Sequence, residues 1–144
     1  LETNPSAFKR GYKDSIKVSI APPLANLIVG FLGALIYVLF NKLFMWIPEN
    51  IFVVIAAMLG FIVNVNIMLA VFTLLPIPGL SGFDIFRDLS RKTFYKYADK
   101  MYQYQIFIFL GVILINNVFP FISYIAMFIR NIFYSILNLL FSFI

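Results

Sequence analysis

Two long apolar stretches, joined by a turn of three residues, constrain the fold of this chain more than any other feature of its sequence. They cover 22–47 and 51–75, and Pro48-Glu49-Asn50 separates them. Each stretch exceeds the roughly 20 residues that a helix needs to cross about 30 Å of hydrocarbon. So short a connection fits only helices that run in opposite directions. The sequence therefore predicts a membrane-embedded helical hairpin.

Composition supports this interpretation, because 62% of the 144 residues are hydrophobic and only 12% are charged. Soluble domains carry about 25% charged residues, and a soluble core of this size could not bury so much apolar surface. The chain has no cysteine, which excludes disulfides and thiolate metal sites, and it has no histidine. We expect an integral, multi-pass protein of the cell membrane.

The rest of the chain divides by composition into five further segments. They are a basic N-terminal segment at 1–21, a Pro/Gly break at 76–82, an amphipathic stretch at 83–105, and apolar stretches at 106–118 and 121–144. The first residues are polar and lack the apolar core of a signal peptide. The last two stretches fit either two separate helices, which we favour, or one kinked span with an interfacial helix. The predicted fold is all-α: a membrane helix bundle with three or four embedded helices and one basic interfacial helix.

The amphipathic stretch alternates aromatic and charged side chains. Its basic residues are Arg87, Arg91, Lys92, Lys96 and Lys100. Two interpretations fit equally well: a helix on the membrane surface that faces anionic headgroups, or a solvated helix.

Basic residues also predict the orientation of the chain in the membrane. They outnumber acidic residues in 1–21 and in 83–105, whereas Lys42 and Glu49 cancel in the connection between the two spans. Cytoplasmic loops carry an excess of lysine and arginine. We therefore expect the N-terminus and the 76–105 region to face the cytoplasm. The net charge of +5 is explained in this way, and no nucleic-acid partner is expected.

Two short motifs carry more specific information. One is APPLAN at 21–26, and the other is NIMLAVFTLLPIPGLSG at 66–82. In order and spacing they resemble the AGPLAN and NxxLAxFNLLPIPPLDGG segments of the site-2 protease family, which are intramembrane zinc metalloproteases. The resemblance covers roughly residues 17–90.

The resemblance implies a zinc site that this chain holds only in part. In the family, two histidines of an HExxH helix and the aspartate of LDG bind zinc, which leaves a fourth position for water. Here Ser81 stands at the aspartate position and Thr73 at the asparagine of FNLLP. Asp84 is a candidate metal ligand, or alternatively an acid at the favourable N-terminal end of a helix.

The resemblance also marks the other candidate site residues. The catalytic candidates are Asn66, Asn26 and Thr73, and the motif loop contributes Pro76, Pro78, Gly79, Ser81 and Gly82. Asn64 is expected to bond a neighbouring helix instead.

Three functions follow as hypotheses. The first is the membrane-embedded part of a site-2-protease-like metalloprotease, which would cut a transmembrane protein or peptide. It would use zinc if the complete protein carries HExxH upstream, although this chain alone supports no cofactor. The second is an inactive relative that has lost its metal and binds transmembrane segments of partners. The third, which we weigh lowest, is a small transporter or channel subunit.

Overall fold

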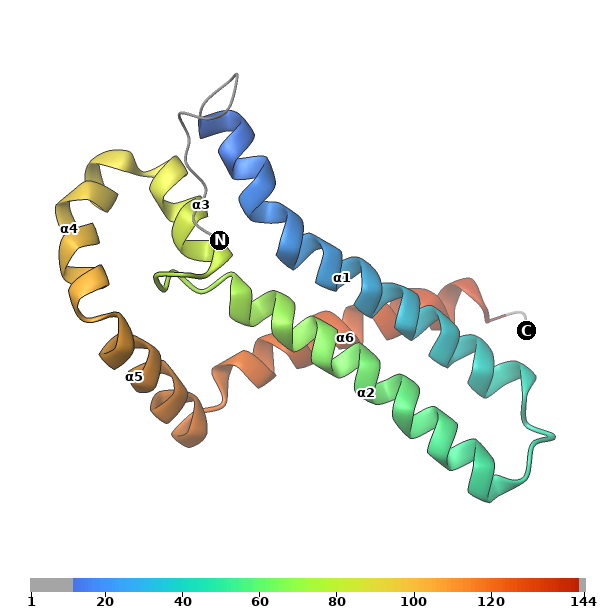
Figure 1. Ribbon diagram of the computed structural model, residues 1–144. Helices are drawn as coiled ribbons and strands as arrows, with labels where there is room; N and C mark the ends of the chain where they lie inside the picture. The colour runs from blue at the N-terminus through green and yellow to red at the C-terminus, as the bar shows by residue number, and fades with distance from the viewer. Residues whose placement is uncertain (1–11, 143–144) are drawn as a thin grey trace.

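The computed structural model describes residues 12–142, and every regular element in that range is a helix. The helices are α1 (Tyr12–Leu43), α2 (Glu49–Thr73), α3 (Ser81–Leu89), α4 (Arg91–Gln103), α5 (Gln105–Val118) and α6 (Phe121–Leu140) (Figure 1). The all-α prediction is therefore confirmed.

Helices α1 and α2 form the hairpin that the two apolar stretches predict, and they lie side by side along most of α2. Glycines let the two backbones approach closely. A β-carbon on Gly30 would lie 3.1 Å from Cγ1 of Ile67, and one on Gly33 would lie 3.2 Å from Cγ2 of Val63. Small residues at such a contact favour helix association in lipid, where packing replaces the hydrophobic effect.

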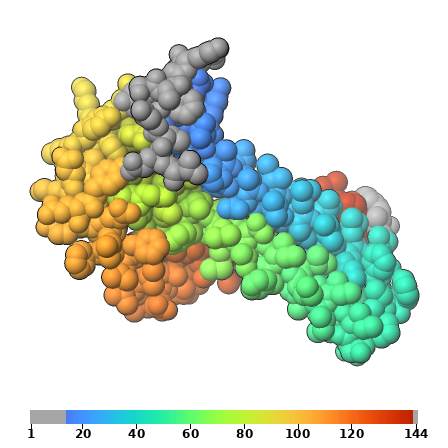
Figure 2. Space-filling view, viewed as in Figure 1, coloured from blue at the N-terminus to red at the C-terminus, as the bar shows by residue number. Residues whose placement is uncertain are grey.

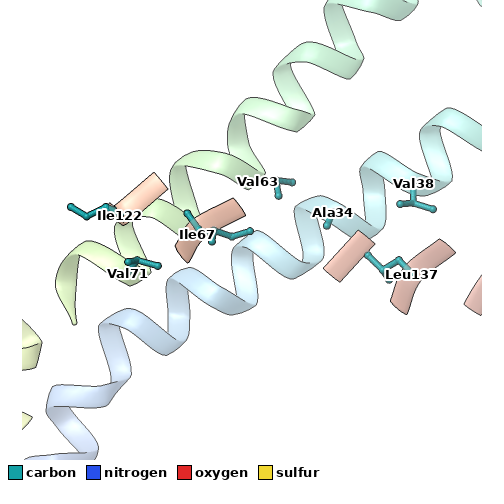
Figure 3. Close-up of a cluster of buried hydrophobic side chains, with 8 residues drawn as sticks. Ala34, Val38, Val63, Ile67, Val71, Ile122 and Leu137 are labelled. Atoms are coloured by element: carbon teal, nitrogen blue, oxygen red, sulfur yellow. The ribbon is translucent and has the colours of Figure 1, made fainter. Parts of the chain in front are cut away.

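Helix α6 completes the main core by packing across α2 and α1. Figure 3 shows Leu137 of α6 beside Ala34 and Val38 of α1, and Ile122 of α6 beside Val71 of α2. The fully or nearly buried members of this core are Ala34, Val38, Val63, Ile67, Val71, Ile122, Ala126 and Leu137. Most other apolar side chains of these helices face outward, as expected of helices in lipid.

The number of membrane helices also agrees with the sequence. Three helical segments are long and apolar enough to cross a bilayer: Asp14–Leu43, Glu49–Thr73 and Phe121–Leu140. Helices α4 and α5 meet the same test only as a pair, and the pair is bent by 87°. The described residues thus provide three spans, or four if that bent pair counts as one.

The first helix begins earlier than the predicted boundary at residue 22. It starts at Tyr12 and continues through Pro22 and Pro23. A proline within a helix removes a backbone hydrogen bond. Pro22 is exposed here, whereas the ring of Pro23 is fully buried and contributes to packing. Residues 1–11 of the predicted basic segment, and the end of the last apolar stretch at 143–144, lie outside the described residues.

The predicted helix at 83–105 is in fact two helices, α3 and α4, which separate at Ser90. A small second core explains the break, because Phe83, Phe94 and Ala98 are buried together only when α3 folds back on α4. Figure 2 shows α4 and α5 as a lobe beside the hairpin, whose closed end projects away from it.

The last two apolar stretches correspond to separate helices, α5 and α6, with Pro120 between them. Helix α5 buries none of its residues. A groove of about 450 Å³ separates it from α2, with apolar walls that include Met68 and Val112.

Candidate functional site

The Pro/Gly segment forms a tight turn between the end of α2 and the start of α3. Gly79 has a φ of 91°, a conformation that residues with a β-carbon rarely adopt. The amide of Leu80 donates a hydrogen bond to the carbonyl of Ile77, 3.0 Å away. Gly82 lies so close to the end of α2 that a β-carbon there would overlap the carbonyl of Leu74. Both glycines of the motif are thus required by backbone geometry.

This turn and the start of the first motif face one small cavity. The cavity has a volume of about 320 Å³, and its walls include Pro22 on α1 together with Gly79, Ser81 and Asp84. The fold therefore brings together two motifs that are far apart in the sequence. Beside the cavity, the side-chain amide of Gln105 donates a 3.2 Å hydrogen bond to the carbonyl of Pro78, which ties the turn to α5.

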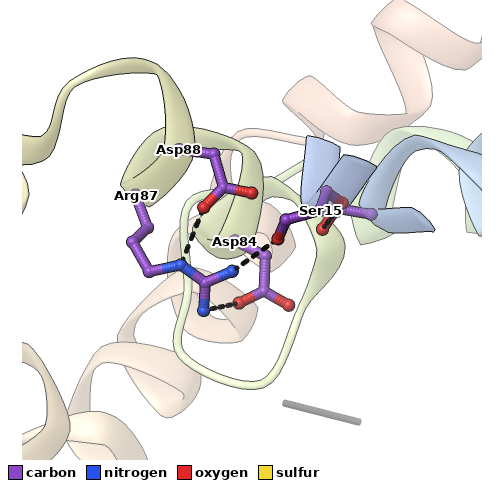
Figure 4. A network of polar contacts seen from close by, with 5 residues as sticks. Ser15, Asp84, Arg87 and Asp88 are labelled. Carbon is purple, nitrogen blue, oxygen red and sulfur yellow. Dashed lines mark hydrogen bonds and ion pairs between the residues drawn. The ribbon is translucent and has the colours of Figure 1, made fainter. Parts of the chain in front are cut away.

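A buried arginine holds the polar groups next to this cavity. Arg87 forms ion pairs of 2.9 Å with Asp84 and with Asp88, and it donates a 3.1 Å hydrogen bond to Oγ of Ser15 on α1 (Figure 4). Arg87 is only 8% exposed and Asp88 only 6%. The network therefore fastens α3 to the N-terminal half of α1.

The surroundings of Arg87 act in opposite directions on its pKa. Burial lowers the pKa, whereas the hydrogen bond with Asp88 and the charges of Asp84 and Asp88 raise it, and the net direction is upward. The guanidinium thus stays charged. The remaining oxygen of Asp88, Oδ2, is buried and has no hydrogen-bond partner among the described residues.

The three catalytic candidates occupy the two long helices. The side-chain amide of Asn66 donates a 2.8 Å hydrogen bond to the carbonyl of Ile62 in its own helix. The hydroxyl of Thr73 likewise donates a 2.8 Å hydrogen bond to the carbonyl of Leu69 in the same helix. Asn26 is half-buried on α1. None of the three is among the residues that line the cavity, so their catalytic roles stay predictions.

A zinc ion does not fit the donor set in the described residues. No group of three or more histidine, cysteine, aspartate or glutamate side chains lies close enough together there to hold a metal. Asp84 already pairs with the guanidinium of Arg87, and Ser81 offers only a hydroxyl. Asp84 does lie in the first turn of α3, the position that the alternative interpretation gives it. The metal role of Asp84 remains a prediction that would need ligands from elsewhere.

Two polar contacts have partners that the sequence pattern does not identify. The amphipathic pattern places Arg87 among the basic residues of the membrane surface, but its side chain is buried. Its spacing of three residues from Asp84 is the sequence signal for the ion pair. The other contact joins Arg130 on α6 to Asn64 on α2, where the guanidinium donates a 2.7 Å hydrogen bond. Asn64 therefore does bond a neighbouring helix, as predicted.

Comparison with known proteins gives a distant relationship. No family model matches the chain, and no solved structure matches it. The chain is 32% identical over 89 residues to a Bacillus subtilis (strain 168) protein described as "Putative zinc metalloprotease YwhC". The match covers 62% of this chain and 41% of that protein, so the chain spans less than half of its relative. The protein is thus a helical membrane protein with distant similarity to this Bacillus subtilis protein.

Proposed function

We propose that this chain is the membrane-embedded part of a site-2-protease-like intramembrane metalloprotease, and that the zinc-binding HExxH helix is supplied by a segment outside this sequence. One observation carries the proposal: Pro22 of the first motif and Gly79 and Ser81 of the second line the same cavity. The similarity to the Bacillus subtilis relative supports it, and the limited coverage of that relative leaves room for a further segment.

In this role the chain supplies one wall of the reaction cavity. Gly79 and Gly82 set the path of the turn, and the Arg87 network holds α3 against α1. An irregular backbone is tolerated at membrane depth only where protein or water surrounds it. A zinc ion, when bound, would activate water and polarise the peptide carbonyl. The substrate would be a transmembrane protein or peptide that is cut on the cytoplasmic side.

The exposed cations of α4 fit the same orientation. Lys92, Lys96 and Lys100 are exposed, and they would contact anionic headgroups at the cytoplasmic surface. Arg87 takes no part in that contact, because its charge is used inside the protein.

The zinc content of the complete purified protein tests the proposal. We expect about one zinc per polypeptide and cleavage of a transmembrane reporter that stops when zinc is removed with a chelator. Replacement of the glutamate in the upstream HExxH motif should abolish cleavage and leave the zinc bound. A complete coding sequence without HExxH, or a protein without zinc, would refute the proposal.

The second candidate is a relative that has lost its metal and retains a site for transmembrane segments. Ser81 at the position of the ligand aspartate favours it, as does the ion pair that occupies Asp84. Such a protein would cross-link to a transmembrane peptide without cutting it. Restoring the acid with Ser81→Asp would then produce neither zinc binding nor cleavage.

A further inference from the structure

An open cavity lined by α1, α2 and α6 contains a charge that no described acid neutralises. Its volume is about 570 Å³, and its lining residues include Tyr37, Asn64, Arg130 and Tyr134. Arg130 donates a hydrogen bond to the neutral amide of Asn64, and none of the ion pairs among the described residues involves it. The cavity is distinct from the one at the Pro/Gly turn, with which it shares no lining residue.

The position of Arg130 along its helix makes this charge unusual. It is the tenth of the 20 residues of α6, and Asn64 is the sixteenth of the 25 residues of α2. At 1.5 Å per residue, about 14 Å of helix lies on either side of Arg130. A cation so far from both ends of a span cannot easily reach the headgroups, and such residues normally face a functional partner.

The α2 side of the cavity suits a close approach by another helix. Ala56 and Gly60 lie on the same face of α2 as Asn64, at successive intervals of four residues, and all three line the cavity. The nearest group to a β-carbon on Gly60 would be the ring of Tyr37, at an ordinary 3.8 Å. Small residues in this spacing allow a second backbone to pack closely.

We propose that Arg130 is the recognition site for a transmembrane helix of another protein that carries an aspartate or glutamate near the middle of its span. The carboxylate would accept hydrogen bonds from the guanidinium, and the helix backbone would pack on Ala56 and Gly60. Bidentate pairing of this kind is specific to arginine and strongest where water is excluded.

A second copy of this chain offers no acid near the middle of a long span among its described residues. Among the described residues, Asp14 and Glu49 lie at the first turns of α1 and α2. The remaining described acids, Asp84, Asp88 and Asp99, belong to α3 and α4, outside the three long spans. The proposal stands whether or not the complete protein is a protease, since it uses none of the residues at the Pro/Gly turn.

Binding of a synthetic transmembrane peptide tests the proposal. The probe is a leucine–alanine helix with one central glutamate, and its matched control carries glutamine instead. Because the chain has no native cysteine, Met45→Cys in the exposed α1–α2 turn accepts a fluorophore, and energy transfer reports binding in phosphatidylcholine vesicles. We expect the glutamate peptide to bind about tenfold more tightly than the glutamine peptide.

Variants then test whether the preference for the glutamate peptide over the glutamine peptide depends on Arg130. Arg130→Gln retains a hydrogen-bond donor for Asn64 but removes the charge, so the glutamate peptide should bind no better than its control. Arg130→Lys should retain part of the preference, and Lys42→Gln, at the end of α1, should retain all of it. Circular dichroism of each variant verifies that its helices are intact.

Three outcomes would overturn the proposal. The first is equal binding of the two peptides by the unmodified chain. The second is a preference that survives Arg130→Gln in a correctly folded protein. The third concerns an anionic lipid: added phosphatidylglycerol abolishes the preference, and this lipid stays bound to the unmodified chain but not to Arg130→Gln. That result would show that Arg130 binds a lipid phosphate.

Discussion

Gly82 in α3 lies directly against the carbonyl group of Leu74, the residue that caps α2. The contact leaves no space for a side chain at position 82, so the end of one helix and the start of the next meet backbone to backbone. The orientation of α3 follows from this contact, and with it the positions of Ser81 and Asp84 at the cavity. The glycine of the motif is therefore a packing requirement, whatever chemistry the complete protein performs.

Gly82→Ala should destabilise the protein by about 2–3 kcal/mol, because overpacking forces the backbone to move. Gly111→Ala is the matched control, since a β-carbon there meets nothing within 4 Å. The control should be neutral or stabilising by up to about 1 kcal/mol through helix propensity. Unfolding by SDS in mixed micelles measures both. Equal effects of the two substitutions would contradict the close contact at Gly82.

Arg87→Met should be among the most damaging single substitutions in α3. It leaves the carboxylate of Asp88 buried without its partner, which costs about 3–5 kcal/mol. The second substitution Asp88→Asn should restore part of the loss, because the uncompensated charge is then removed. Lys92→Met, on the exposed surface of α4, is the control and should change stability by less than about 0.5 kcal/mol. If Arg87→Met unfolds at the same SDS concentration as the control, the network contributes little.

Gly33→Val tests the contact between the two helices of the hairpin. Its β-carbon would lie 3.2 Å from a methyl group of Val63, and the added methyl groups would have to push α1 away from α2. We expect a loss of about 1–3 kcal/mol. At Gly60 an added β-carbon would lie 3.8 Å from its nearest neighbour, so Gly60→Val controls for the introduction of valine itself. The prediction fails if both variants unfold at the same SDS concentration.

The orientation in the membrane can be measured with single cysteines. Trp46→Cys lies in the α1–α2 turn and Ser90→Cys between α3 and α4, and both positions are exposed. The distribution of basic residues predicts that a membrane-impermeant thiol reagent labels position 46 from outside intact cells and position 90 only after the membrane is opened. Labelling of both positions from the same side would contradict this topology.

Much of the fold could be predicted because periodic, apolar and uninterrupted stretches leave few alternatives in a membrane. The hairpin, the turn after Leu75 and the break at Pro120 all follow from such local signals. The start of α1 could not be predicted in this way, because Pro22 and Pro23 normally mark a helix boundary, whereas in the structure the helix continues through both and buries Pro23. The break at Ser90 has a similar cause, since the second core forms from residues of both α3 and α4.

Some features of the candidate site could likewise be predicted from the sequence, and others could not. The sequence by itself determined that the chain is a helical membrane protein, that a Pro/Gly turn ends its second span, and that it carries no histidine for zinc. Only the tertiary structure decided that Pro22 and Ser81 share a cavity, that Arg87 is buried between two acids, and that Arg130 reaches Asn64. The physical reason is that hydropathy is a property of each stretch alone. The partner of a charged side chain depends instead on which helices pack together.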